Sequence, residues 1–221
     1  MDSIPLIRAR YLQAFAHAAD TSGVRSYRLA EDLNIPQKLF EVPDAVHPAN
    51  QLFKFAGAAA HATGRADLGL EAGRTRLKDH GDFGTKVTGS LTLHQALVNF
   101  CTEALKEYSR AFFWIERRGE TTWFCRHKID GDEDERRQVE LYLVELMLQT
   151  VRMVAGPQWC PQEIWLQTDE VPALSDTETL APLNVRFSRP ILAIPVPRKL
   201  MSHALPRSCR DRARNNDEPQ K

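Results

Sequence analysis

The residues able to do acid–base, nucleophilic or metal chemistry are present, but their spacing matches no catalytic motif. The seven histidines include neither an H-E-x-x-H motif nor a pair four residues apart, the spacing that holds a metal on one helix face. The chain also lacks a G-x-S-x-G elbow, a phosphate-binding loop that ends in Gly-Lys-Ser/Thr, and a G-x-G-x-x-G fingerprint. We therefore predict no catalytic residue, no metal site, no cofactor and no enzymatic activity.

Two local features allow a more specific chemistry. Asp130, Asp132 and Asp134 alternate as in a calcium-binding loop, but a glycine stands at position two and position twelve is not a glutamate. We interpret them as the start of a helix, because the positive end of a helix favours acidic side chains. Cys160 is the candidate nucleophile of a small hydrolase, which is the enzyme alternative, yet no His or Lys stands beside it to activate the thiol.

Five aromatic residues lie in strand-like segments of the second half of the chain. Aromatic side chains on one sheet face can line an apolar pocket that has few polar anchors. The same residues are equally well explained as core packing, so both interpretations stay open at this point. The set consists of Phe112, Trp114, Trp123, Phe124 and Trp165.

The helices that must position these residues are visible as apolar side chains at intervals of three and four. This periodicity predicts helices over residues 7–19, 48–63 and 92–108, and a long helix that follows the acidic run and ends at Gly156. At the third of these, Thr92 and Gln95 form a capping-box pair. The glycine-rich segment 67–89 is expected to hold one short helix followed by a loop that crosses the core.

Residues 29–35 superficially look like the first helix and turn of a DNA-reading helix-turn-helix. Pro43 and Pro48 leave fewer than two turns for the recognition helix that should follow. We therefore predict a short packing helix and a loop instead.

Strand signals lie mostly in the second half. Residues 112–118 and 121–127, joined by Gly119-Glu120, predict a β-hairpin with a type II′ turn. Residues 163–167, 184–187 and 191–196 predict three short strands, and the prolines of the last one confine it to an edge of the sheet or to an irregular extension. We expect an α+β fold in which several helices pack on a small, mostly antiparallel sheet.

Length and composition suit one compact domain. The chain has 221 residues, of which 43% are hydrophobic, and its 29 basic residues balance its 29 acidic ones. It shows neither a signal peptide nor an apolar run long enough for a membrane, and its cysteines form no C-x-x-C pair, which favours the cytoplasm. We expect one domain over residues 1–206, followed over 207–221 by a basic, disordered tail or the first part of a linker.

The order of several motifs resembles a known family. The motifs are Leu68-Gly-Leu-Glu-Ala-Gly73, Gly81-Asp-Phe-Gly84, Ser90-Leu-Thr-Leu-His-Gln-Ala-Leu97, Phe113-Trp-Ile-Glu-Arg117, Trp123-Phe-Cys125, Glu140-Leu-Tyr-Leu-Val-Glu-Leu-Met147, Trp159-Cys-Pro161, Ile164-Trp-Leu-Gln167, Leu183-Asn-Val-Arg-Phe187 and Ile191-Leu-Ala-Ile-Pro-Val-Pro197. In this order they are similar to the N-terminal, arabinose-binding-type domain of AraC/XylS transcription regulators. The resemblance covers nearly the whole chain up to Pro206.

The resemblance implies a bacterial sensing and dimerisation domain. The family attaches such a domain to a C-terminal DNA-binding part, which we expect to be missing here, so DNA would be bound only through that absent part. The implied partners are a small organic effector and a second copy of the chain in a homodimer. The alternative is a ligand-free protein-interaction or dimerisation module, which a core without a cavity would favour.

Within this interpretation, residue type selects the candidate site. We expect Phe83, Trp114 and Trp123 near the effector, with Arg126 or Arg186 as the anchor of a carboxylate. For the dimer, the apolar stripes of two helices are the candidates, and the residues chosen are Leu97, Phe100, Leu143 and Leu146.

Overall fold

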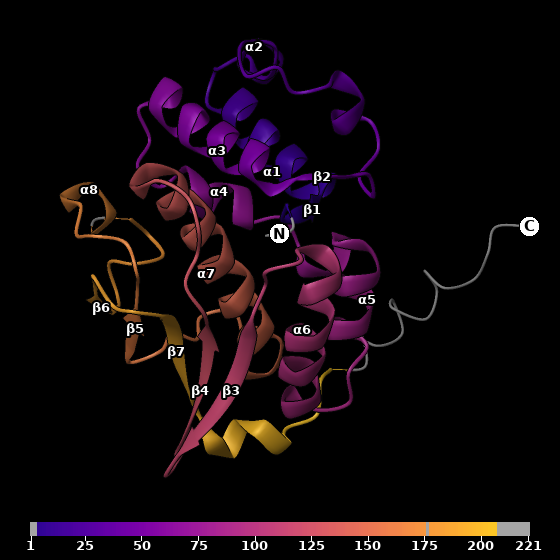
Figure 1. Cartoon of the computed structure of the whole chain (residues 1–221). Coiled ribbons are helices and arrows are strands. Elements are labelled where there is room, and N and C mark those ends of the chain that lie inside the picture. The colour runs from indigo at the N-terminus through magenta and orange to yellow at the C-terminus, as the bar shows by residue number, and fades with distance from the viewer. Residues whose placement is uncertain (1–3, 176, 207–221) are drawn as a thin grey trace, which may run out of the picture.

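The computed structural model describes residues 4–175 and 177–206, so the predicted disordered tail lies outside the described residues. The described part contains eight α-helices and seven strands in an α+β fold, as the sequence predicts (Figure 1). The helices are α1 Ala9–Thr21, α2 Ser26–Asp32, α3 Ala49–Thr63, α4 Leu68–Gly73, α5 Gly81–Thr88, α6 Leu93–Glu107, α7 Glu133–Ala155 and α8 Pro172–Ser175. The strands are β1 Leu6–Arg8, β2 Val46–Pro48, β3 Phe113–Arg118, β4 Thr121–Arg126, β5 Glu163–Trp165, β6 Asn184–Arg186 and β7 Leu192–Pro197.

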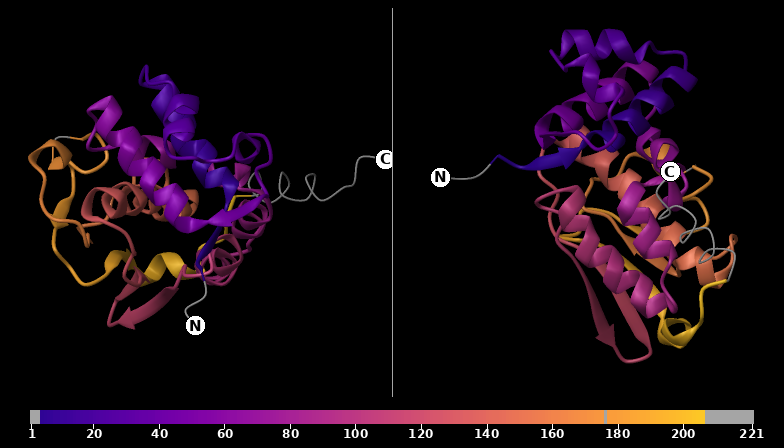
Figure 2. Two further views of the ribbon diagram at one scale, coloured as in Figure 1. Left: turned by 45° about the horizontal axis from the view of Figure 1, so that its top comes forward. Right: turned by 90° about the vertical axis from the view of Figure 1, so that its right-hand side faces the viewer.

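A five-stranded sheet and a helical layer enclose the core. The strand order is β3-β4-β7-β5-β6, antiparallel except for the parallel pair β5–β6, and β1 and β2 form a separate two-stranded sheet. Helices α1 to α4 lie at one end of the molecule, α5 and α6 lie side by side, and α7 runs from the helical end toward the sheet (Figures 1 and 2). The inner sheet face and these helices share one hydrophobic core.

Two capped helices begin where the sequence predicts. The hydroxyl of Thr92 accepts the backbone N–H of Gln95, at 3.3 Å, and starts α6. The Gln95 side chain reaches one residue further back than in a capping box and accepts the N–H of Leu91. Asp132 and Glu135 form a complete capping box at α7, which confirms the acidic run as a helix start.

The hairpin β3–β4 forms as predicted, and its turn is of the predicted type. Gly119 has a φ of 59°, whereas Glu120 is not among the described residues with positive φ, and this combination identifies a type II′ turn. Residues 29–35 likewise fall in α2 and a loop, and a four-residue 3-10 helix, Gln37–Phe40, stands where a recognition helix would be needed.

The prediction for segment 67–89 is right about the short helix, which is α4, but wrong about the loop, because a 3-10 turn at Leu77–Asp79 and a second helix, α5, replace it. Its glycines serve close packing instead. The backbone of α4 approaches α7 so closely that a Cβ on Gly69 would lie 2.1 Å from the carbonyl oxygen of Gln138. The amide of Gln138 fixes this approach, since it accepts the N–H of Gly69 and donates to the carbonyl of Ala66.

The edge position predicted for β7 is also wrong, because β7 lies in the middle of the sheet. On one side it pairs with β4 over its whole length, so that Pro195 stands opposite Trp123. On the other side β5 pairs with it only at Ala193. The prolines therefore lie beyond the reach of β5, where a missing backbone N–H leaves no ladder bond unmade.

Candidate functional site

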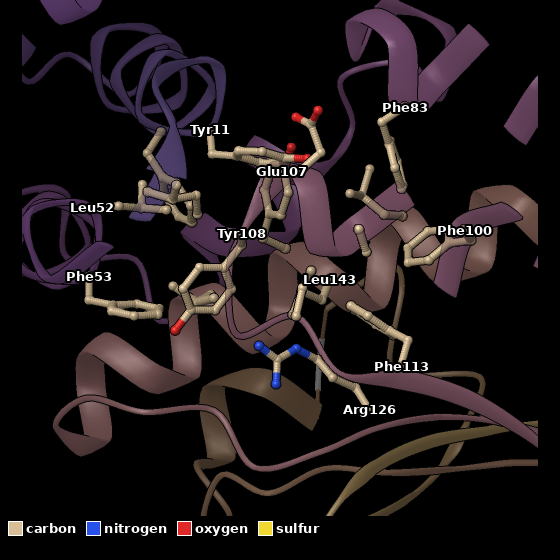
Figure 3. A pocket seen from close by; sticks show the side chains of 17 residues that line it. Tyr11, Leu52, Phe53, Phe83, Phe100, Glu107, Tyr108, Phe113, Arg126 and Leu143 are labelled. Atoms are coloured by element: carbon tan, nitrogen blue, oxygen red, sulfur yellow. The ribbon is translucent and has the colours of Figure 1, made fainter. Parts of the chain in front are cut away.

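A cavity of about 50 Å³ lies where α1, α3, α5, α6 and α7 meet the inner face of β3 and β4 (Figure 3). Nearly all its wall is apolar, and the polar side chains that reach it are one arginine, one glutamate and three tyrosines. The lining residues are Ile7, Tyr11, Phe15, Leu52, Phe53, Phe83, Phe100, Ala104, Glu107, Tyr108, Ala111, Phe113, Arg126, Val139, Tyr142, Leu143 and Leu146.

Local periodicity explains why these side chains converge. Phe100, Ala104 and Glu107 follow one another at intervals of four and three on the buried side of α6. Phe113 and Arg126 stand directly opposite each other in the β3–β4 ladder, so both side chains lie on the same sheet face. The helix and the hairpin thus close the cavity from two directions.

Arg126 is the most unusual side chain of the cavity. It is 1% exposed, and among the described residues it has no carboxylate partner. Its guanidinium donates to the backbone carbonyls of His127 at 2.6 Å, Lys128 at 3.2 Å and Arg110 at 3.5 Å, while its Nε–H finds no acceptor in the described part of the chain. Burial lowers the pKa of Arg126 to about 10, so the side chain stays charged at neutral pH.

Aromatic rings surround this cation. The guanidinium carbon lies 5.4 Å from the ring centre of Phe113 and 6.0 Å from that of Tyr108. Figure 3 shows the guanidinium extending from the strand toward Tyr108 and Leu143. The two rings attract the cation through their faces, but they do not neutralise its charge.

Glu107 supplies the negative charge of the site. Its Oε2 lies 3.3 Å from Nε of Arg10, but neither atom has a hydrogen-bond partner among the residues that the structure describes. Burial raises the pKa of Glu107, and Arg10 opposes this shift. Burial and the neighbouring charge of Glu107 also raise the pKa of Tyr11.

A buried histidine holds a further lining tyrosine in place. The Nδ1–H of His80 donates to the carbonyl of Arg76 at 3.1 Å, so Nε2 accepts the hydroxyl hydrogen of Tyr142 at 2.7 Å. Burial lowers the pKa of His80, which favours the neutral ring that this arrangement needs. The Tyr142 hydroxyl is therefore engaged, and the ring presents its apolar face to the cavity.

Comparison with known proteins identifies the family. The N-terminal arabinose-binding domain of AraC transcription regulators matches residues 23–205. The chain belongs to this family. The domain is thus a ligand-binding regulatory domain of the AraC type.

A solved structure has a similar fold. The crystal structure of the transcriptional regulator CdpR from Pseudomonas aeruginosa aligns with a TM-score of 0.60 and 15% sequence identity, over 87% of this chain and 61% of that chain. At this identity the likeness shows the fold alone, and the domain spans less than two thirds of that regulator. A comparison with curated proteins found no match.

The structure brings together two of the five residues selected for the effector. Phe83 and Arg126 both line the cavity. Trp114 and Trp123 lie on the other face of the sheet, where Trp123 packs on Trp165 with ring centres 4.6 Å apart. Arg186 is on β6, with 58% of its side chain exposed and Glu163 3.7 Å away, so it does not reach the cavity.

The residues selected for the dimer lie inside the chain. Leu97, Phe100 and Leu146 are buried in the core, and Leu143 is half-buried beside them. Three of the four line the cavity. The exposed apolar side of α6 consists instead of Val98 and Leu105, which are 40% and 43% exposed and lie two turns apart.

Sequence reasoning missed Tyr11, Glu107, Tyr108 and Phe113. A signal for Glu107 was available, because an acidic residue continues the apolar row of α6 at the position where the helix is buried. A signal for Phe113 was also available, because the hairpin places it opposite Arg126 and therefore on the same sheet face. Tyr11 comes from a helix far away in the sequence, and only the fold shows its proximity.

Metal binding and thiol catalysis have little support among the described residues. Among them, no three His, Cys, Asp or Glu side chains gather as metal ligands would. Exposed Cys160 lies in a groove between Glu120 and Pro197, and no His or Lys is among the residues lining that groove. None of the described helices is both long and apolar enough to cross a membrane.

Proposed function

We propose that this domain, over residues 1–206, senses a small organic effector in the cavity and passes the signal to the rest of a bacterial AraC-type transcription regulator. One observation carries this proposal: an almost wholly apolar cavity contains a buried arginine that has no carboxylate partner within residues 4–175 and 177–206. Ligand sites are typically apolar hollows with a few polar groups that orient the ligand. This cavity has that character without serving any catalytic arrangement, so we propose no enzymatic activity.

A bound effector would contact several structural elements at once through the cavity walls. The walls come from α1, α3, α5, α6, α7 and the β3–β4 hairpin, which are spread over much of the sequence. An effector that contacts them in one packing arrangement more strongly than in another shifts the population toward the first. Only this difference in affinity between two states transmits a signal.

We also propose that the regulator is a homodimer in the cytoplasm and that the outer side of α6 takes part in the contact. Val98 and Leu105 are the exposed apolar residues of this helix, and Phe100 and Ala104 line the cavity from its inner side. A shift of α6 would therefore change both the cavity and the dimer contact. DNA binding belongs to a separate part of the regulator.

The proposal is tested by thermal unfolding of the chain with a library of sugars, amino acids, organic acids and aromatic compounds. A ligand that binds only the folded state stabilises it by about 2.7 kcal/mol at a hundred times its Kd. We expect a concentration-dependent rise in Tm for one class. Ala104→Phe fills the cavity and should abolish the rise, while Trp114→Ala, on the other sheet face, should retain it.

The second candidate is a dimerisation module without a ligand. The small size of the cavity favours it, because drug-sized ligands usually occupy about 300–1,000 Å³. A stable dimer together with no change in Tm across the whole library would support this module and contradict effector sensing. Retention of the shift in Ala104→Phe together with its loss in Trp114→Ala would move the effector to the other sheet face.

A further inference from the structure

We propose that the effector is an apolar monocarboxylate whose carboxylate binds Arg126 and whose hydrocarbon part occupies the aromatic cavity. This inference rests on the effector-binding function proposed above and narrows it to one chemical class. It follows from the donors left free on Arg126, from the charges around the cavity, and from the apolar character of the wall.

Arg126 retains the capacity to bind an anion. A guanidinium has five N–H donors, and three hydrogen bonds go to the carbonyls of His127, Lys128 and Arg110. The Nε–H is buried without an acceptor. Carbonyls are neutral, so they orient the group without pairing its charge. Asp130 and Glu140 attract the guanidinium, but neither forms an ion pair with it among the described residues. A carboxylate that accepts from Nε–H would supply the missing acceptor and the missing charge together.

The charges around the cavity favour a single negative charge. Arg126 is the only cation among its lining residues, and Glu107 lines another part of the same cavity. Glu107 has its own ionic partner in Arg10, at 3.3 Å. A phosphate or a dicarboxylate would place a second negative charge in an apolar space that already contains Glu107, at a high desolvation cost. A primary amine would meet the uncompensated charge of Arg126.

The rest of the wall selects an apolar body. Phe53, Phe83, Phe100 and Phe113 line the cavity, and the hydroxyl of Tyr142 is already bonded to His80. A sugar brings several hydroxyl groups, each of which needs a partner when it is buried. The wall offers too few partners for them, so a polyhydroxylated ligand is disfavoured relative to a hydrocarbon chain or ring.

The size of the cavity determines which monocarboxylates fit without a rearrangement of the wall. About 50 Å³ suits a short chain, and a larger ligand must displace a lining side chain. Phe113 and Leu143 are the half-buried residues of the wall and are the ones with room to move. Straight-chain and aromatic acids share the carboxylate chemistry, and the experiment distinguishes them.

Isothermal titration calorimetry of the full chain tests the class with matched probes. The acids are butanoate, hexanoate and benzoate, and the controls are 1-hexanol, benzamide, succinate and arabinose. A charge-assisted hydrogen bond contributes enough to change affinity by roughly ten- to a hundredfold. We expect at least one monocarboxylate to bind about tenfold or more tightly than its neutral analogue, and succinate and arabinose to bind weakly.

Arg126→Met and Arg126→Lys test the anchor, with Arg186→Met as the matched control on an exposed arginine. The acid should lose about tenfold or more in affinity with Arg126→Met, lose part of it with Arg126→Lys, and bind Arg186→Met as it binds the unaltered chain. If Arg126→Met fails to fold, the comparison of acid with neutral analogue and the Arg126→Lys variant decide.

The outcomes separate the two levels of the proposal. Tighter binding of an alcohol, amide or sugar than of any acid would overturn the carboxylate class while leaving effector sensing intact. Acid binding that survives Arg126→Met but is lost in Arg186→Met would overturn the role of Arg126. Absence of binding by every probe and by the wider library would overturn both the class and the sensing function.

Discussion

Glu140 makes the stability of the chain depend on pH. Its carboxylate is fully buried and accepts the N–H groups of Gln167 at 2.7 Å and Thr168 at 2.9 Å. Burial outweighs these bonds and raises the pKa of Glu140 to about 7. Between about pH 4.3, its ordinary pKa, and pH 7, the folded chain therefore binds a proton that the unfolded chain releases.

The contribution of Glu140 to the free energy of unfolding should accordingly fall as the pH rises from 5 to 7 and become level above 7. Burial lowers the pKa of His80 and His47, and these two groups act in the opposite direction as the pH rises toward 6.5. The contribution of Glu140 is on the order of 3 kcal/mol. Burial raises the pKa of Glu107 and Glu145 as well, so the fall has more than one source. Urea unfolding at several pH values measures this dependence. Between pH 5 and 7, Glu140→Gln should remove the part of the fall in the free energy of unfolding that Glu140 causes, and the same pH dependence in the variant and the unaltered chain would contradict this assignment.

Individual site residues were predictable only in part. Residue type alone selected Arg126 and Phe83, because a cation and an aromatic ring are common components of carboxylate sites. Alternation along the hairpin separates Trp114 and Trp123 from Phe113 and Arg126, but it does not show which set the helices cover. The sequence-based selection therefore included Trp114 and Trp123 of the outer face, although the cavity lies on the inner face.

At the scale of elements, the packing of α4 on α7 depends on glycine. A Cβ at Gly69 would lie 2.1 Å from the backbone oxygen of Gln138, so one of the two helix backbones would have to shift. Gly69→Ala should lower the free energy of unfolding by about 1–3 kcal/mol, or more if the two helices separate.

Gly57→Ala is the matched control for this substitution in urea unfolding. Its new Cβ would lie 3.2 Å from Cγ of Glu135, which belongs to a flexible side chain, and alanine is favoured over glycine in a helix such as α3. We expect a change close to zero or a small stabilisation. Equal effects of Gly57→Ala and Gly69→Ala would show that close approach is not what the glycine at position 69 provides.

The elements themselves were the most predictable level, for physical reasons. Helices α1, α3, α6 and α7 have apolar rows at helical spacing, and caps or glycines mark their ends. The short helices α4 and α5 have too few turns to show a row, and their glycines look like loop residues until the neighbouring helix is known. The prolines likewise led to a wrong position for β7, because a proline is tolerated in a central strand where the neighbouring strand, here β5, has already ended.

At the scale of the whole molecule, the proposed dimer depends on the exposed side of α6. The double variant Val98→Glu and Leu105→Glu places charges on that side without touching the core. Sedimentation velocity should show a dimer for the unaltered chain and a monomer for the variant. Tyr27→Glu, on exposed α2, is the control and should remain dimeric; dissociation by Tyr27→Glu alone would place the contact at the other end of the molecule.

The α+β class was predictable from the order of elements, whereas the cavity was not. Helices that cluster early and strands that cluster late already favour this class. The cavity instead depends on how α1, α3, α5, α6, α7 and a hairpin meet, and such long-range contacts leave no periodic signal in the sequence. The family resemblance predicted that a ligand site exists, and the structure supplies a candidate position for it.

The most direct test of the cavity as the effector site is two-dimensional ¹⁵N NMR of the full chain during titration with hexanoate or benzoate. The Nε–H signal of Arg126 reports on the cavity, and the indole N–H signals of Trp114, Trp123 and Trp165 report on the outer sheet face. We predict that the Arg126 signal shifts with saturation while the three indole signals stay in place. Shifts confined to the indole signals would contradict the account.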